Sequence, residues 1–238
     1  MKQAISMHGW CCDSTFWANW EQYFQNDGWL WKNAERGYGN YEASNPVWDN
    51  NAETSMGKKK VIFCHSLGIH LVPSKILKEA SDIILINSFS RFIPNGSSSR
   101  AVRTGLIGMQ KHLGKTTESK MLLMFLKKAN QPYKIPDCID GPLSQRISDE
   151  GRKQLIEDFN LLIKSHELPK ALSKKARILA IQGEEDKIIS PIANDQLISD
   201  LRLHLDHPPT QWRLAGEGHI IQLPGIIKKV SNWLKSTK

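Results

Sequence analysis

The sequence predicts an α/β fold: a mostly parallel, doubly wound sheet of about six strands with an inserted helical lid. Two observations predict it. Short apolar runs alternate with helical patterns, as in parallel β-α-β units. Between residues 88 and 165, helical patterns follow one another without a convincing strand, and about 75 residues is too many for a connection inside a compact sheet. We therefore expect residues 1–87 and 166–238 to form the core and residues 88–165 to form the lid.

Length and composition are those of an ordinary globular protein. The 238 residues are 40% apolar and 24% charged, enough for one α/β domain with a substantial insertion. No apolar run reaches the length of about 18 residues that suggests a membrane span, and the first residues lack the apolar stretch of a signal peptide. We therefore expect a cytoplasmic protein. The four cysteines are Cys11, Cys12, Cys64 and Cys138. They lack the paired spacing of a zinc site, so we expect free thiols and no bound metal. We also expect no cofactor.

The first predicted strand, Gln3–Met7, ends in the turn His8-Gly9-Trp10. Asp13 or Ser14 is positioned to cap the helix that follows. Aromatic residues recur in that helix at helical spacing, which indicates core packing: Phe16, Trp17, Trp20 and Phe24. A second short strand is expected at Trp29–Trp31.

A serine stands between a strand pattern and a helical pattern. The apolar run that begins at Val61 leads into Ser66, and helical spacing continues beyond it. A nucleophilic serine requires this context, because it sits at the apex of a sharp strand-to-helix turn whose flanking residues must be small. In the motif G-x-S-x-G, Gly68 is present and Cys64, itself small, replaces the leading glycine. Pro73 lies early in the expected helix, where its missing N–H costs little.

Three more strands are predicted, at Ile83–Ile86, Ala176–Gln182 and Gln211–Leu214. Asp186 follows the second of them and His219 the third. Functional loops of open α/β sheets lie at the carboxyl ends of strands, so these acidic and basic residues fall where a site is expected. A closing amphipathic helix is expected from apolar residues at helical spacing, namely Ile220, Ile221, Ile226, Ile227, Val230 and Trp233.

The chain order Ser66, Asp186, His219 is that of the α/β-hydrolase triad. A serine hydroxyl is a poor nucleophile at neutral pH, so a histidine must take its proton and later return it to the leaving group. A carboxylate fixes the tautomer of the histidine and stabilises its cationic form. Glu184 and Glu185 compete for the acid role, and the Gly-x-x-Asp spacing favours Asp186.

Four motifs in this order resemble those of the α/β-hydrolase superfamily, over nearly the whole chain. They are His8-Gly9-Trp10, Cys64-His65-Ser66-Leu67-Gly68, Gly183-Glu184-Glu185-Asp186 and Gly218-His219. The resemblance implies an oxyanion hole formed by the backbone N–H groups of Trp10 and Leu67. The chain departs from the family pattern at Cys64 and in starting directly at the strand before His8, without the usual antiparallel N-terminal hairpin.

Within the superfamily, the His-Gly-Trp turn and the compact basic lid look most like the pimeloyl-[acyl-carrier protein] methyl ester esterases of biotin synthesis. That resemblance implies a serine carboxylic ester hydrolase whose lid binds an acidic acyl carrier protein. Residues 91–134 carry nine Arg and Lys residues against one Glu, an excess equal to the +8 of the whole chain. We expect no nucleic-acid or membrane partner, and hypothesise carrier contacts at Arg100, Arg103, Lys111 and Lys115.

Other interpretations of single residues are weaker. Cys64 lies two positions before the turn apex, which favours a structural role over a nucleophilic one. His204 and His207 precede the last strand, so His219 is the better base. A metal could be sought among residues whose spacing fits no tetrahedral site: His8, Cys11, Cys12 and His65. Two alternative functions stay open: hydrolysis of small-molecule esters, thioesters or a carbon–carbon bond by the same triad, and a catalytically silent binding protein.

Overall fold

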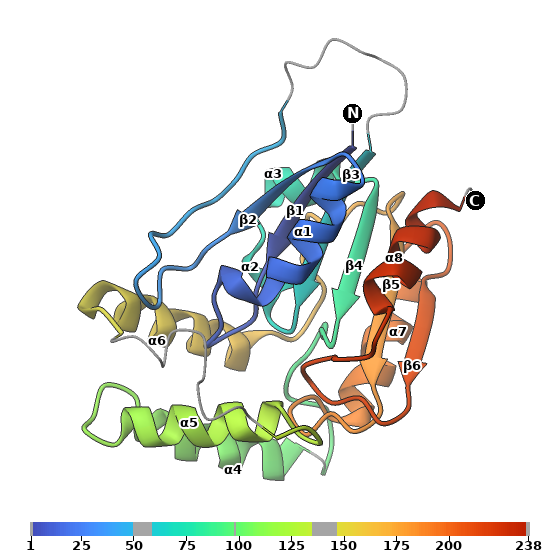
Figure 1. Ribbon diagram of the computed structural model, residues 1–238. Helices are drawn as coiled ribbons and strands as arrows, with labels where there is room; N and C mark the ends of the chain where they lie inside the picture. Colours follow the sequence, from blue (N-terminus) through green and yellow to red (C-terminus); the bar gives the residue numbers. More distant parts are fainter. Residues whose placement is uncertain (1, 50–58, 98, 135–146, 237–238) are drawn as a thin grey trace.

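The computed structural model describes residues 2–49, 59–97, 99–134 and 147–236. Its six-stranded sheet has the order β2-β1-β3-β4-β5-β6, with every neighbouring pair parallel (Figure 1). All six predicted strands are confirmed, and no antiparallel hairpin joins the described part of the sheet. The strands are β1 (Lys2–Met7), β2 (Trp29–Ala34), β3 (Lys59–His65), β4 (Asp82–Ile86), β5 (Arg177–Gly183) and β6 (Thr210–Leu214).

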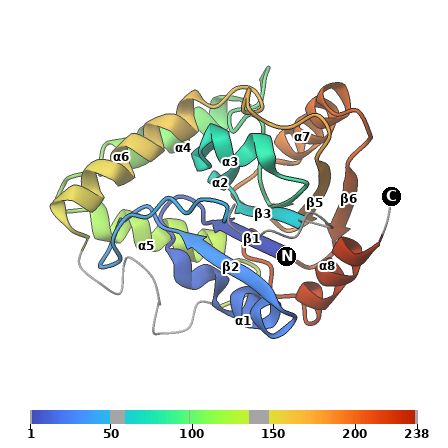
Figure 2. The same ribbon diagram turned by 90° about the horizontal axis from the view of Figure 1, so that it is seen from above.

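Helices cover both faces of the sheet, as Figure 2 shows. One face carries the 3-10 turn η1 (Ser14–Trp17), α1 (Ala18–Asn26) and α8 (Ile226–Lys235), and the other carries α2 (Gly68–Leu71), α3 (Ser74–Glu79) and α7 (Pro191–His204). Because the central strands are covered on both sides, they are continuous apolar runs rather than alternating ones. The predicted aromatic stripe of the first helical segment is in the core, with Trp17 and Phe24 fully buried.

Between β4 and β5 the chain forms α4 (Ser99–Gln110), α5 (Glu118–Ala129) and α6 (Asp149–Lys164). Helices α4 and α5 lie across the carboxyl ends of the strands (Figure 1). Within residues 88–97, 99–134 and 147–165 there is no strand of the sheet, and an isolated antiparallel bridge between Arg91 and His166 brings the two ends of the insertion together. That this insertion acts as a separate lid stays a prediction.

Two predicted helices differ from those observed. The helix behind Ser66 is split into α2 and α3, because the backbone is extended at Val72 (ψ 129°), where the following Pro73 disfavours helical geometry. The closing helix begins at Ile226 instead of Ile220. Gly225, at φ +75°, turns the chain immediately before it.

The sequence predicts free thiols, and the described cysteines confirm this prediction. Cys11, Cys12 and Cys64 are free thiols, and Cys138 lies outside the described residues. Among the described helices, none has the length and apolarity needed to cross a membrane.

Candidate active site

Ser66 occupies the turn between β3 and α2 with φ +53°, a left-handed conformation that non-glycine residues rarely adopt. Gly68 and Gly9 must lack a side chain because other atoms of the protein approach their Cα atoms closely. A Cβ on Gly68 would lie 2.6 Å from the Met7 carbonyl oxygen, and a Cβ on Gly9 would lie 2.9 Å from the Cβ of Ser66. The strained serine therefore lies directly against the turn that follows β1.

Cys64, which stands where the motif has its leading glycine, is completely buried in the core. Burial raises the pKa of its thiol far above the ordinary value, because the charged thiolate would lose its solvation. A protonated thiol inside the core is a packing group. The position before the turn apex thus accepts a cysteine, which fits the structural role expected from the sequence.

Asp186 and His219 meet at the carboxyl edge of the sheet. His219 Nδ1 lies 2.8 Å from Asp186 Oδ2, and both side chains are almost fully buried. The other oxygen, Oδ1, accepts hydrogen bonds from the backbone N–H groups of Ile188 (2.6 Å) and Ile189 (2.9 Å). With both oxygens accepting, the carboxylate is held in one orientation, and it directs the Nδ1–H of His219 toward itself.

The competing acids and histidines are exposed or make other contacts. Glu184 and Glu185 are exposed, and Glu185 pairs with Lys187 instead of a histidine. His204 Nε2 lies 2.8 Å from the Leu172 carbonyl oxygen, and His207 is exposed. Among the acids and histidines compared after β5 and β6, Asp186 and His219 are therefore the two that pair.

The serine turn contacts the histidine loop through His65. Its Nε2 lies 3.1 Å from the His219 carbonyl oxygen, and the two rings are 4.8 Å apart between centroids. The His65 ring also stacks on Phe16, with the ring centroids 4.3 Å apart. Burial, reinforced by the neighbouring His219, lowers the pKa of His65 well below its ordinary value. His65, which precedes Ser66, is thus an uncharged residue that packs against the loop bearing His219.

The two expected oxyanion donors lie in different turns, Trp10 after β1 and Leu67 after β3. The backbone N–H groups of Trp10 and Leu67 donate to no acceptor within the described ranges. The Trp10 side chain is anchored to the inserted helices: its indole N–H donates to the Leu155 carbonyl of α6 (2.8 Å), and its ring packs against Phe125 and Phe159, each 5.1 Å away.

No protein-family model and no curated protein match the sequence. Solved structures do match. An esterase from Exiguobacterium antarcticum superposes with a TM-score of 0.67 over 99% of this chain and 92% of its own, at 16% identity. A bromoperoxidase from Bacillus anthracis gives a TM-score of 0.67 over 99% of this chain and 92% of its own, at 11% identity. An esterase from Rhodococcus sp. ECU1013 gives 0.58 over 100% and 91%, at 12% identity.

The chain has the α/β-hydrolase fold. In this fold the loops after β1, β3, β5 and β6 are the ones that carry Trp10, Ser66, Asp186 and His219. The sequence-predicted positions thus fall at one edge of the sheet.

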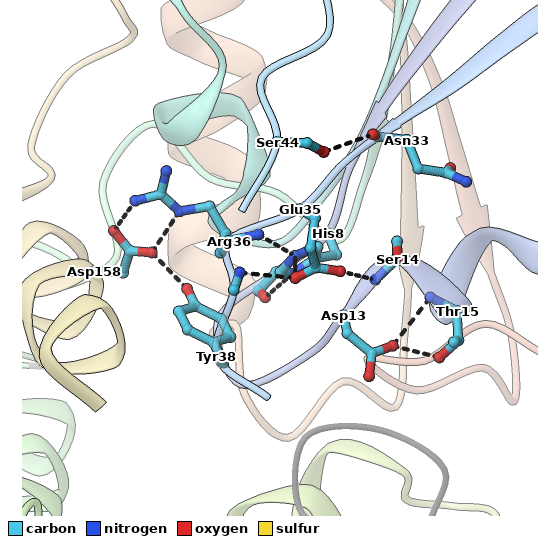
Figure 3. Close-up of polar contacts among 12 residues, drawn as sticks. His8, Asp13, Ser14, Thr15, Asn33, Glu35, Arg36, Tyr38, Ser44 and Asp158 are labelled. Atoms are coloured by element: carbon cyan, nitrogen blue, oxygen red, sulfur yellow. Dashed lines mark hydrogen bonds and ion pairs between the residues drawn. The ribbon is translucent and has the colours of Figure 1, made fainter. Parts of the chain in front are cut away.

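A buried polar network beside this edge was not predicted from the sequence (Figure 3). His8 Nε2 lies 3.2 Å from Glu35 Oε1, and Glu35 also accepts from the N–H groups of Ser14 (2.8 Å) and Gly37 (3.0 Å). Burial acts to raise the pKa of Glu35, but these hydrogen bonds and His8 outweigh it and lower that pKa to about 2. Glu35 therefore stays ionised and holds the side chain of His8, the residue before Gly9, in place.

The same network continues into α6. Asp158 accepts two hydrogen bonds from Arg36, at 2.7 and 2.6 Å, and a third from the Tyr38 hydroxyl at 2.6 Å. Bidentate pairing of this kind holds two elements in a defined geometry. Helix α6 is thereby fixed to the loop after β2 (Figure 3). No short-range pattern signals these contacts, because Arg36 and Asp158 are 122 residues apart.

A pocket of about 810 Å³ opens between α4, α5 and the loop that starts at Asp186. Of the three predicted triad residues, Asp186 lines it. Its wall is largely apolar, and three lysines line it as well. The apolar side chains include Phe92, Leu106, Met109, Met121 and Phe125, and the lysines are Lys120, Lys128 and Lys187.

The four basic residues selected from the sequence are all exposed, on α4 and in the connection to α5, and they do not line this pocket. Glu118, the one acidic residue of the basic segment 91–134, is buried and forms an ion pair with Arg152 of α6. Because the Glu118 carboxylate is buried against Arg152, it does not offset the positive charges exposed on α4 and the connection to α5. Among the described residues, no group of three or more His, Cys, Asp or Glu side chains is arranged to hold a metal ion.

Proposed function

We propose that the protein is a serine carboxylic ester hydrolase in which Ser66 is the nucleophile, His219 the general base and Asp186 the residue that orients it. The observation that carries the proposal is the buried Asp186–His219 hydrogen bond of 2.8 Å on a loop that contacts His65, next to a serine at φ +53°. A strained serine beside an acid–histidine pair is the arrangement that acyl transfer requires.

In the first step, the Ser66 hydroxyl oxygen attacks the ester carbonyl carbon while His219 Nε2 takes the hydroxyl proton. Negative charge develops on the carbonyl oxygen, and the N–H groups of Trp10 and Leu67 donate to it. Collapse of this intermediate expels the alkoxide, which receives the proton from His219. Ser66 is left acylated.

In the second step, His219 takes a proton from water, and the resulting oxygen nucleophile attacks the acyl carbon. The new intermediate breaks its bond to Ser66 Oγ, which recovers the proton from His219. A carboxylic acid is released and the enzyme is restored. Asp186 stays ionised and stabilises the imidazolium formed in each step.

For the substrate, we propose the methyl ester of a pimeloyl group on an acidic acyl carrier protein, a cytoplasmic reaction of biotin synthesis. Two features support this choice. The pocket beside Asp186 is apolar enough for an acyl chain. The surface of α4 and the following connection is basic, and Glu118, the first residue of α5, is buried against Arg152. Such a surface attracts an acidic carrier.

A second candidate is the hydrolysis of small-molecule esters or thioesters, or of a carbon–carbon bond, by the same residues. It is favoured because none of the four selected basic residues lines the pocket. The Exiguobacterium and Rhodococcus structures are themselves named as esterases. In this case the basic surface plays no part in turnover.

A fluorophosphonate probe tests the catalytic proposal. We expect it to label Ser66, as mapped by peptide mass, and to leave the Ser66→Ala variant unlabelled. Ser88→Ala is a matched control, because Ser88 is also buried and lies two residues after the neighbouring strand β4. Labelling that is lost in the control, or that never reaches Ser66, contradicts the proposal. Rescue of a biotin auxotroph that lacks its methyl esterase then separates the two substrate classes.

A further inference from the structure

Asn87 is the first residue after β4, the strand between β3 and β5. Its side chain is completely buried, and its backbone is left-handed at φ +44°. Asparagine tolerates this conformation better than most residues. The turn that bears Ser66 follows β3, on one side of β4, and the turn that bears Asp186 follows β5, on the other side.

The Asn87 side chain joins the two loops that carry the acid and the base. Its Oδ1 accepts from the N–H of Gly183 at 2.8 Å, three residues before Asp186. Its Nδ2 donates to the carbonyl oxygens of Gly218 at 2.9 Å and of His219 at 2.8 Å. The reverse orientation of the amide is excluded, since it would set the NH₂ group against the Gly183 N–H and the oxygen against two carbonyls.

The backbone at this point also reaches the serine turn. The Ile86 carbonyl accepts from the N–H of Ser66 at 2.9 Å, and the Asn87 N–H donates to the Ile181 carbonyl at 2.8 Å. Two successive residues therefore contact the loops of all three proposed triad members. The acid and base loops are in close contact as well, because a Cβ on Gly183 would lie 2.4 Å from the Gly218 carbonyl oxygen.

We propose that Asn87 is a positioning residue that sets the geometry of the Asp186–His219 pair; this rests on the proposed ester hydrolysis. Asn87 does not line the pocket beside Asp186. Its loss should therefore impair the acid–base pair more than the binding of substrate. Displacement of catalytic groups by about 1 Å can cost about 100-fold in rate.

The test compares Asn87→Gly and Asn87→Asp with Asn33→Ala. Glycine removes the amide without strain at φ +44°. Aspartate keeps the size and the acceptor for Gly183 but cannot donate to the two carbonyls. Asn33 is a matched control in β2: its amide accepts from Ser6 (2.6 Å) and Trp31 (2.7 Å) and donates to Glu21 (2.6 Å), away from the proposed triad.

We expect kcat to fall about 100-fold in both Asn87 variants, with KM changed by less than about threefold. Asn33→Ala should lower the melting temperature comparably and keep kcat within about threefold of the parent. An independent readout is the low-field proton resonance of the His219 Nδ1–H in the NMR spectrum. It should persist in Asn33→Ala and weaken or shift in the Asn87 variants.

The outcomes separate the two proposals. Unchanged kcat and an unchanged resonance in the Asn87 variants, or a kcat loss no larger than in Asn33→Ala, overturn the role of Asn87. If the parent protein cleaves no ester and Ser66 resists the fluorophosphonate, the proposed function fails. In that event the resonance alone decides whether Asn87 sets the Asp186–His219 geometry.

Discussion

The indole N–H of Trp10 donates to the backbone carbonyl of Leu155, 2.8 Å away, and thereby joins the turn after β1 to helix α6. The backbone of the same residue carries one of the two proposed oxyanion donors. A side chain anchored in the inserted helices thus holds the residue that carries this proposed donor. The position of α6 and the geometry of the proposed oxyanion site are therefore coupled.

Trp10→Phe tests this coupling. The ring contacts with Phe125 and Phe159 are largely kept, whereas the hydrogen bond to Leu155 is lost. We expect a loss of about 1–2 kcal/mol in the free energy of unfolding and a fall in kcat of about tenfold or more. Trp48→Phe is the matched control, because Trp48 is also buried and donates to a backbone carbonyl, that of Ile76. Equal kcat values in the two variants would contradict the coupling.

Glu35 should make stability depend on pH in a defined window. Its pKa is lowered from 4.5 to about 2 in the folded protein, so the unfolded chain binds the proton first as the pH falls. The stabilisation is complete above the unfolded value of 4.5 and is lost as the pH falls toward about 2.

We therefore expect the stability difference between the parent and Glu35→Gln to shrink on going from about pH 6 to about pH 3. Urea unfolding at a series of pH values measures it. A difference that stays constant across this range would show that the carboxylate is not held in its charged form. Glu157→Gln, at an exposed position of α6, serves as the control.

How much could be predicted from the sequence depends on how local the determining interactions are. The strands at β3, β4 and β5 were predictable because strands covered on both faces are uninterrupted apolar runs. The positions of Ser66, Asp186 and His219 followed from the motifs after each strand. The split between α2 and α3 could have been predicted from Val72 and Pro73, since a residue before proline avoids helical geometry.

The supporting contacts were not predictable in this way. Asn87 follows a buried strand like many loop residues, and its role depends on Gly183, Gly218 and His219, which are 96 to 132 residues away in the chain. Arg36 and Asp158 likewise meet only after β2 and α6 are placed. Periodicity reports on burial along one element, whereas these contacts depend on how loops from different elements converge.

Cys64→Ala should keep the activity. The thiol is buried and its raised pKa keeps it protonated, so it supplies packing and not a nucleophile. We expect a loss of about 1 kcal/mol in the free energy of unfolding from the missing sulfur contacts, and kcat within about twofold of the parent. Thiol alkylation under native conditions should leave Cys64 unmodified, as read by peptide mass. A loss of activity as complete as that of Ser66→Ala would assign Cys64 a chemical role.

The proposed carrier contacts lead to a prediction about substrate size. The parent should hydrolyse the carrier-linked ester with a kcat/KM that falls as salt is added, because attraction between a basic surface and an acidic carrier is screened. Hydrolysis of a small methyl ester should not respond to salt in this range. The two substrates share the reaction at Ser66 and differ only in the part that reaches the surface of α4.

Reversing the charges of Arg100, Arg103, Lys111 and Lys115 to Glu should lower kcat/KM for the carrier-linked ester about 100-fold or more and leave the small ester within about twofold. These side chains are exposed and do not line the pocket, so the chemistry and the acyl pocket are untouched. The control reverses four other exposed basic residues, Lys170, Lys174, Arg202 and Lys228, which gives the same net charge. Because both variants change the total charge equally, a selective loss in the first locates the carrier on α4. Equal losses would reduce the effect to net charge, and unchanged turnover in both would leave the small-molecule esterase as the function.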